Sequence, residues 1–400
     1  MAKSFIITGG NFLNTGAEAM SYTTISELRR RYPDCSITMV IDYGNGEKYE
    51  SLKCKLLYLS SDCMKMLGNT LTFKEYIKAV IKRIVGKEDA FKEIKEFQKV
   101  IKESDAAFDI SGYILSSQWD INGNINKLAQ MNMIINGKIP YYVLPQSFGP
   151  FEYGDRKEWM ISKIRETLSQ CKTVYAREKE GYYLLKHELG LSNVSLSPDI
   201  VLQNRRIEWE LVETDKQEVI NSIEINKGSV AVVPNMRIQD LIKEEELIKI
   251  YSEIIEELLL LDKSVVLIPH SAEDGILCKK IKDQFEQGKV LLIEKKLDSR
   301  SFESIINKMD FAIASRFHSI VHAYKNIIPC IILGWAIKYK ELAALFNQEE
   351  YVFDVRDSID LLSIMKAEKR LNDRVLIEKE EIRKKLELIQ ESACFDELEF

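Results

Sequence analysis

The chain has 400 residues, and at roughly 100–200 residues per domain this length predicts two domains with a large buried core. Hydrophobic residues make up 46% of the chain and charged residues 30%, with only 8 Pro and 18 Gly, which excludes a fibrous or disordered protein. The 56 Lys and Arg residues against 62 Asp and Glu residues give a formal net charge of −6, which argues against sequence-independent binding to nucleic acid.

We expect a cytoplasmic protein without a transmembrane helix. The first residues, MAKSFIITGG, hold an apolar run that is too short for a signal peptide. The longest weakly polar stretch, 327–337, is about half of the roughly 20 residues that a membrane span needs. The seven cysteines form no CxxC pair, so we expect reduced thiols and neither a disulfide framework nor a metal site.

Short apolar runs alternate with longer segments of helical periodicity along most of the chain. This alternation is typical of α/β units built around parallel sheets. In the first half the apolar runs lie at 5–8, 37–41, 106–110, 142–144, 173–175 and 194–196.

Segment 74–87, KEYIKAVIKRIVGK, predicts a basic amphipathic helix. One face carries Tyr76, Ile77, Val80, Ile81 and Ile84, and lysines and an arginine lie among the polar positions. Such a helix can lie on anionic lipid, which leaves open a peripheral contact with the inner face of the membrane. We favour the other interpretation, a helix that packs its apolar face against the core.

Polar loops follow three strands of the first half, at 9–20, 108–120 and 144–152. In open parallel sheets, ligands bind beyond the carboxyl ends of the strands, near helix amino termini. The loops offer five candidate ligand-binding residues: Asn14, Gly16, Glu18, Ser111 and Gln146. The first loop is not GxGxxG and no Walker sequence occurs, so neither dinucleotide nor nucleoside triphosphate binding is indicated.

A polar, acidic segment at 203–228 separates the first series of runs from a second. The second series lies at 230–233, 265–268, 290–293, 311–314 and 330–333. We predict a Rossmann-like domain over 1–205, a second over 206–370, and a C-terminal amphipathic helix within 371–400.

The strand ends of the second half carry the densest group of chemically active residues. Arg237 and His270 follow the first two strands of this series, and SRFHS at 315–319 follows the fourth. An arginine and an imidazole at a helix amino terminus suit a small polyanion whose reaction needs a proton transfer. His318 and His322 have the i, i+4 spacing of a zinc site, but no HExxH glutamate accompanies them.

In this order, the motifs resemble those of the polysaccharide pyruvyl transferase family. The similarity covers about residues 5–346 and includes the first loop, the SG turn at 111–112, LPQSFGP at 144–150, YARE at 175–178, SPD at 197–199, and SRFHS with the downstream Lys338. The resemblance implies a glycosyltransferase-B-like fold, in which two Rossmann-like domains face a cleft. It also implies transfer of pyruvate from phosphoenolpyruvate to two hydroxyls of a sugar in a cell-surface polysaccharide or its precursor, forming a ketal without a metal or cofactor.

The resemblance assigns roles to individual residues. His318 is the expected catalytic acid/base. The donor side is expected to contain Arg316, Lys338, Arg237, Ser315 and His270. The acceptor side is expected to contain Asn14, Gly16, Glu18, Ser111, Gln146 and Arg177, for a sugar that is lipid-linked, nucleotide-linked or polymeric.

Two alternatives remain open from the sequence. A glycosyltransferase of the same architecture would use the same cationic residues to bind the diphosphate of a nucleotide sugar. A relative that keeps the fold without turnover would bind a ligand only. Preference for phosphoenolpyruvate over nucleotide sugars distinguishes the first alternative from the main hypothesis.

Overall fold

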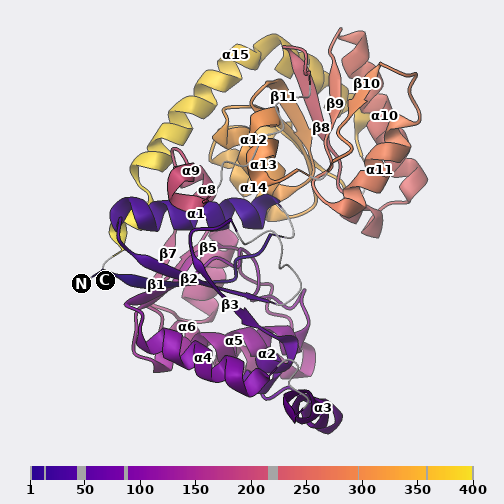
Figure 1. Cartoon of the computed structure of the whole chain (residues 1–400). Coiled ribbons are helices and arrows are strands. Elements are labelled where there is room, and N and C mark those ends of the chain that lie inside the picture. The colour runs from indigo at the N-terminus through magenta and orange to yellow at the C-terminus, as the bar shows by residue number, and fades with distance from the viewer. Residues whose placement is uncertain are drawn as a thin grey trace.

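The computed structural model describes residues 2–12, 15–42, 51–84, 89–214, 224–295, 297–356 and 359–398. Over these ranges the chain forms two parallel sheets, each covered by helices (Figure 1). The predicted α/β architecture with two Rossmann-like domains is confirmed.

Seven described strands form the N-terminal sheet, in the order β3-β2-β1-β4-β5-β6-β7. All neighbours pair in parallel. The elements of this domain are β1 (Ser4–Thr8), α1 (Thr15–Arg31), β2 (Ser36–Asp42), β3 (Lys55–Leu59), α2 (Ser61–Leu67), α3 (Phe73–Ile84), α4 (Ala90–Lys102), β4 (Ala106–Asp109), α5 (Ile121–Asn136), β5 (Tyr141–Gln146), α6 (Lys157–Leu168), β6 (Thr173–Ala176), α7 (Lys179–Tyr183), β7 (Val194–Leu196), α8 (Ile200–Gln203) and α9 (Trp209–Val212).

The C-terminal sheet holds six described strands, in the order β10-β9-β8-β11-β12-β13, also parallel throughout. Its elements are β8 (Ser229–Val233), α10 (Glu244–Leu260), β9 (Val265–Leu267), α11 (Ala272–Lys282), β10 (Val290–Leu292), α12 (Ser299–Ile306), β11 (Met309–Ala314), α13 (Phe317–Lys325), β12 (Cys330–Gly334), α14 (Ile337–Ala344), β13 (Val352–Asp354) and α15 (Leu361–Glu391).

The central strands are apolar because helices cover both faces of each sheet. Every residue of β4, β5 and β8 is buried, which is why these strands are continuous apolar runs in the sequence. β3 and β13 were not predicted. Both are edge strands that are only partly buried. β13 has only two apolar residues before Asp354, whereas β3 does contain an apolar run, at 56–59, that was not assigned to a strand.

The chain stays on the N-terminal domain beyond the expected boundary at residue 205. Trp209 of α9 lies against Tyr22 of α1, with ring centroids 5.2 Å apart. Leu52 and Glu213 form an antiparallel bridge. The described segment up to Thr214 therefore packs with the first domain.

The C-terminal helix α15 begins at Leu361, ten residues before the expected start, and spans both domains (Figure 1). Its first half packs on α10, and its last turns reach the N-terminal domain at α8. There Gln390 donates to the Leu202 carbonyl, and the Cys394 N–H donates to Gln203 at 2.6 Å. α15 thus links the two domains.

Glu368 on α15 is fully buried, and neither carboxylate oxygen has a hydrogen-bond partner among the described residues. Burial, followed by the charge of Glu257, raises its pKa from 4.5 to about 9. Stability from this group is present below pH 4.5 and is lost as the pH rises toward 9, because only the unfolded chain ionises freely there. We expect Glu368→Gln to stabilise the protein at neutral pH by about 2–3 kcal/mol. The measurement is urea unfolding at neutral and acidic pH.

The control for this prediction is Glu387→Gln, an exposed position of the same helix. It is expected to change the free energy of unfolding by less than about 0.5 kcal/mol. An equal effect of Glu368→Gln at both pH values would contradict the assigned cause.

The favoured interpretation of the basic amphipathic helix was wrong. The described part is α3, and of its residues only Ala79 is buried. Its large apolar side chains face solvent because α3 is attached to the domain through its polar side, where Lys82 pairs with Asp62 at 2.7 Å. No helix of the described ranges is long and apolar enough to cross a bilayer.

Candidate active site

The topology brings four loops together between the domains. The strand order reverses between β1 and β4 in one sheet and between β8 and β11 in the other. Ligands of parallel α/β sheets bind at such reversal points, beyond the carboxyl ends of the strands. The loop and helix that follow β1 pack directly against the helix that follows β11, so the two reversal points face each other.

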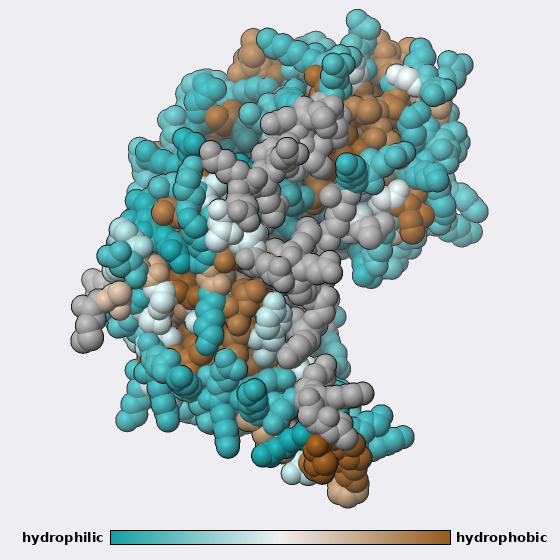
Figure 2. All heavy atoms as spheres, viewed as in Figure 1, coloured by the Kyte–Doolittle hydropathy of each residue, from teal (hydrophilic) through white to brown (hydrophobic). Residues whose placement is uncertain are grey.

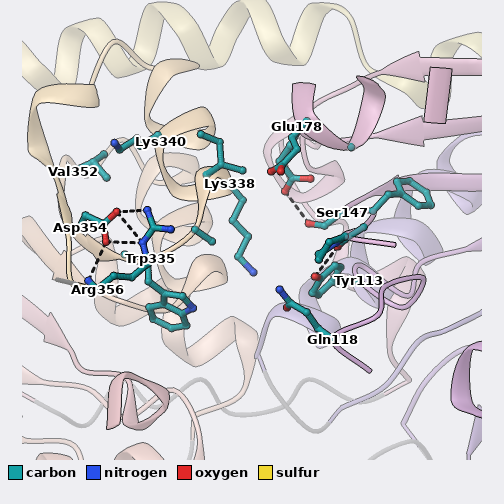
Figure 3. A pocket seen from close by; sticks show the side chains of 18 residues that line it. Tyr113, Gln118, Ser147, Glu178, Trp335, Lys338, Lys340, Val352, Asp354 and Arg356 are labelled. Carbon is teal, nitrogen blue, oxygen red and sulfur yellow. Dashed lines mark hydrogen bonds and ion pairs between the residues drawn. The ribbon is translucent and has the colours of Figure 1, made fainter. Parts of the chain in front are cut away.

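A pocket of about 490 Å³ lies between the domains, with walls of different chemistry (Figure 3). The C-terminal wall carries the cationic residues Lys338, Lys340 and Arg356, with Trp335 and Asp354 beside them. The N-terminal wall carries hydroxyl, amide and carboxylate groups from Tyr113, Gln118, Ser147, Glu178 and Glu180. One wall is therefore suited to anions and the other to neutral polar groups.

Lys338 extends from the first turn of α14 into the middle of this pocket (Figure 3). Its Nζ lies 5.3 Å from the ring centroid of Tyr113 and 5.7 Å from those of Phe317 and Tyr339. Burial, followed by the charge of Arg177, lowers the pKa of Lys338 to about 8. This ammonium group is poorly solvated, so an anion in the pocket would gain more from it than from a lysine in water.

The buried guanidinium of Arg177 joins both domains behind the pocket. Its Nε donates to Ser147 Oγ at 3.0 Å and to Glu178 Oε1 at 2.9 Å. Its Nη1 donates to Asp199 Oδ2 at 2.9 Å. From the other domain, the ring centroid of Phe317 lies 4.2 Å from Cζ. Arg177 is therefore a positioning residue of the domain contact.

His318, at the amino terminus of α13, packs under Gly16 of α1. A Cβ on Gly16 would lie 2.1 Å from the His318 Cγ, so this approach requires glycine. The imidazole Nε2 has no hydrogen-bond partner in the described residues and lies 3.7 Å from Asp199 Oδ2. Burial, followed by the charge of Arg177, lowers the pKa of His318 well below 6.5. The ring is therefore neutral at pH 7, and His318 is not among the residues that line the pocket.

Three predicted donor-binding residues lie outside the pocket. Arg316 donates to both oxygens of Asp274, with nitrogen–oxygen distances of 3.0 and 2.6 Å. The buried Ser315 hydroxyl lies 2.7 Å from that of Tyr251. Arg237 has a side chain that is 60% exposed and lies 3.6 Å from a carboxylate of α11. Of the predicted donor-binding residues, Lys338 alone lines the pocket.

His270, predicted on the donor side, and Glu18, predicted on the acceptor side, form contacts between the domains. His270 Nε2 lies 2.6 Å from Thr15 Oγ1, and Glu18 Oε2 accepts the Ser299 N–H at 2.7 Å. The side chains of His270 and Glu18 are buried. Together with Gly16, these residues fix α1 against the C-terminal domain.

Ser111 and Gln146 belong to a buried network around Asp109. The Ser111 N–H and the Gln146 side chain both donate to Asp109 Oδ1, at 3.1 and 3.3 Å. Burial alone would raise the pKa of Asp109, but the ion pair with Lys127 and the Ser111 N–H hold it below its usual value. The network orders the loops that carry the N-terminal wall. Asn14 lies outside the described residues.

Sequence reasoning missed several residues of the site. Asp199 and Glu178 stand just after predicted strands, in the motifs SPD and YARE. Their position at strand ends could have marked them as site residues, but the motifs supported only the family resemblance. Nothing in the sequence marks Tyr113 as a site residue except its place in the polar loop 108–120. Asp354 ends the unpredicted strand β13, and it pairs with Arg356 at 2.6 Å. In the described ranges, no three His, Cys, Asp or Glu side chains are grouped as metal ligands.

We expect Arg177→Met to destabilise the folded protein by about 3–5 kcal/mol, because it leaves the buried carboxylates of Asp199 and Glu178 without their cation. Urea unfolding measures the change. Arg156→Met, at an exposed arginine whose Cζ lies 5.9 Å from the Trp159 ring centroid, is the control and is expected to have little effect. Equal changes in both variants would contradict the role of Arg177.

Solved structures with the same architecture define the class of fold. UDP-GlcNAc 2-epimerase from Methanocaldococcus jannaschii matches with a TM-score of 0.59 at 16% identity, over 98% of this chain and 93% of that one. A putative UDP-N-acetylglucosamine 2-epimerase from Listeria monocytogenes matches with a TM-score of 0.59 at 12% identity, over 99% and 92%. S. aureus TarM matches with a TM-score of 0.58 at 10% identity, over 99% and 98%. These similarities show a glycosyltransferase-B-like fold.

The family model of the polysaccharide pyruvyl transferases matches residues 14–336, most of the chain. The chain therefore belongs to the polysaccharide pyruvyl transferase family, and the resemblance seen in its motifs is confirmed. A search of curated proteins finds no match.

Proposed function

We propose that this protein transfers the pyruvyl group of phosphoenolpyruvate to two hydroxyls of a sugar in a cell-surface polysaccharide or its precursor, forming a pyruvate ketal. The observation that carries the proposal is the division of charge across the pocket between the domains. The cations lie on the C-terminal wall and the hydroxyl, amide and carboxylate groups on the N-terminal wall. Membership of the pyruvyl transferase family supports the same reaction.

The C-terminal wall is the proposed donor side. Phosphoenolpyruvate carries up to three negative charges on its phosphate and carboxylate, and Lys338 is the cation that extends furthest between the walls (Figure 3). Lys340 lies near enough to the same space to bind a second anionic group, whereas the guanidinium of Arg356 is held by Asp354. Arg316 acts indirectly in this scheme, since its guanidinium is held by Asp274.

The N-terminal wall is the proposed acceptor side. Carboxylates such as Glu178 and Glu180 accept hydrogen bonds from sugar hydroxyls, and Tyr113 and Gln118 add further polar contacts. Trp335, across the pocket, offers an aromatic face to the sugar ring.

The reaction requires one proton on the methylene carbon of phosphoenolpyruvate and the loss of protons from two hydroxyls. Protonation of that carbon produces an oxocarbenium-like centre, which the first hydroxyl attacks. Phosphate then leaves with its bonding electrons, and the second hydroxyl closes the ketal. The second hydroxyl proton leaves with phosphate, so atoms and charge balance.

His318 is the proposed acid/base of this sequence. Because its pKa is lowered, it is deprotonated in the free enzyme. In this scheme the ring, once protonated, gives that proton to the methylene carbon and then takes the proton of the attacking hydroxyl. A carboxylate close to one ring nitrogen orients a catalytic imidazole and stabilises its protonated form, and Asp199 lies at 3.7 Å from Nε2. The charges of the bound donor would further favour the protonated ring.

A thermal-shift titration tests the proposal. A ligand present at about 100 times its dissociation constant adds about 2.7 kcal/mol to the stability of the folded protein. We expect phosphoenolpyruvate to raise the melting temperature of wild type and to raise that of Lys338→Met by clearly less at the same concentration. Stabilisation by UDP-sugars and not by phosphoenolpyruvate would instead assign the pocket to glycosyl transfer.

A further inference from the structure

Helix α3 presents its apolar face to solvent at the far end of the N-terminal domain (Figure 1). Phe73 is 80% exposed and Ile84 is 77% exposed, with Tyr76, Ile77 and Ile81 between them at 42–52%. Figure 2 shows the hydrophobic residues of this end as one continuous patch. Helical spacing places all five side chains on one side of the helix.

The orientation of α3 is fixed by polar contacts on its opposite side. Lys82 Nζ lies 2.7 Å from Asp62 Oδ2, and Glu75 Oε1 lies 2.6 Å from Lys65 Nζ, both on α2. The preceding Thr72 hydroxyl also donates to Glu75, at 2.7 Å. In a soluble domain an amphipathic helix turns its apolar side inward. Here the ion pairs hold that side outward.

The charges beside the patch are positive. Lys74 and Lys78 are exposed along one edge of the apolar face, and Arg83, on the other edge, lies 3.7 Å from Asp89. The only acidic residue of α3, Glu75, is paired on the opposite side. This local surface is therefore cationic in a chain whose formal net charge is −6.

We propose that α3 docks the protein on the surface of an anionic phospholipid bilayer, with the helix parallel to the membrane plane. Apolar residues that enter the acyl boundary, flanked by lysines that contact anionic headgroups, are the features of an interfacial helix. The helix has 12 residues, so it lies on the bilayer and does not cross it. A second copy of this chain fits less well, since two cationic faces would repel.

A short path connects α3 to the pocket. Thr70, just before α3, donates to Asn126 of α5 at 2.7 Å. Two residues earlier in α5, Asn124 Oδ1 accepts the Ser116 N–H at 3.1 Å, in the loop that contributes Tyr113 and Gln118 to the N-terminal wall. In the docked protein, α5 would therefore connect the membrane-bound helix α3 to the loop that forms part of the N-terminal wall.

Sedimentation with large unilamellar vesicles tests the proposal without any catalytic readout. The probes are vesicles of phosphatidylcholine alone and of phosphatidylcholine with phosphatidylglycerol. We expect wild type to bind the anionic vesicles at least about tenfold more strongly than the neutral ones. Phe73→Ser with Ile84→Ser, and separately Lys74→Glu with Lys78→Glu, should each lower that binding about tenfold or more.

The matched control replaces two equally exposed apolar residues of α15, Leu362→Ser with Leu376→Ser, which are 71% and 83% exposed. It should bind vesicles as wild type does. All variants change exposed side chains, so their melting temperatures should stay near that of wild type, which separates lost docking from lost folding.

Three outcomes would overturn the proposal. In the first, wild type does not bind the anionic vesicles. In the second, one of the α3 double variants binds them as strongly as wild type does. In the third, wild type binds neutral and anionic vesicles equally. Light scattering adds a fourth: a wild-type dimer that becomes a monomer in Phe73→Ser with Ile84→Ser would show that a second copy covers the face.

Discussion

Replacing His318 by asparagine is expected to lower kcat about 10²–10⁴-fold while phosphoenolpyruvate still binds. Asparagine is smaller than histidine, so it fits beneath Gly16, where a Cβ on the glycine would come within 2.1 Å of the imidazole. It cannot take a proton near neutral pH. The loss should therefore appear in kcat, while the dissociation constant for the donor changes little.

The measurement is phosphate release from phosphoenolpyruvate in the presence of a panel of oligosaccharides and nucleotide-linked sugars. His187→Asn is the control, because His187 is exposed beside Tyr183, away from the pocket, and should retain wild-type turnover. Wild-type turnover in His318→Asn would refute the assignment of His318 as the acid/base.

Lys338→Met is expected to weaken phosphoenolpyruvate binding by about 1.5–3 kcal/mol, or about 10- to 150-fold. The ammonium group of Lys338 extends into the pocket and is poorly solvated, so its removal takes away the strongest single attraction for the anion. Isothermal titration calorimetry measures the loss. Lys340→Met is the control in the same wall, and its exposed side chain should contribute less.

The same residue predicts how donor binding depends on pH. The pKa of Lys338 is lowered to about 8, so the free enzyme carries the charge below pH 8 and loses it above. A bound anion favours the charged form, so affinity should be full below pH 8 and should fall as the pH rises through that value. Lys338→Arg keeps its charge throughout and should remove the fall. If the affinity of Lys338→Arg for the donor fell with pH as that of wild type does, deprotonation of Lys338 would not be the cause of the fall.

The sequence predicts the parallel strands well where they are buried on both faces. β1, β4, β5, β8, β11 and β12 all contain apolar runs that periodicity detects. β13 was missed because its three residues hold only two apolar side chains, whereas β3 does contain an apolar run, at 56–59, that was not interpreted as a strand. The α3 helix was predicted as an element but with the wrong face inward, since periodicity shows which side is apolar and not which side meets the protein.

A site residue was predictable where no other side chain of the protein binds it. Lys338 follows the buried strand β12 and does line the pocket. Arg316 follows an equally buried strand, but Asp274, 42 positions earlier in the chain, takes its guanidinium. Pairings of this length depend on the folded arrangement of two loops, and local sequence contains no signal for them. The contacts of Arg177 with Asp199 and Phe317 were hidden for the same reason.

The most direct test of the central claim is mass spectrometry of the products formed from phosphoenolpyruvate and a panel of sugar acceptors. We predict an acceptor heavier by one pyruvate less one water, formed together with one phosphate, by wild type and not by His318→Asn. Unchanged phosphoenolpyruvate, with transfer of a hexose from an added nucleotide sugar by the same protein, would contradict it and assign the cleft to glycosyl transfer.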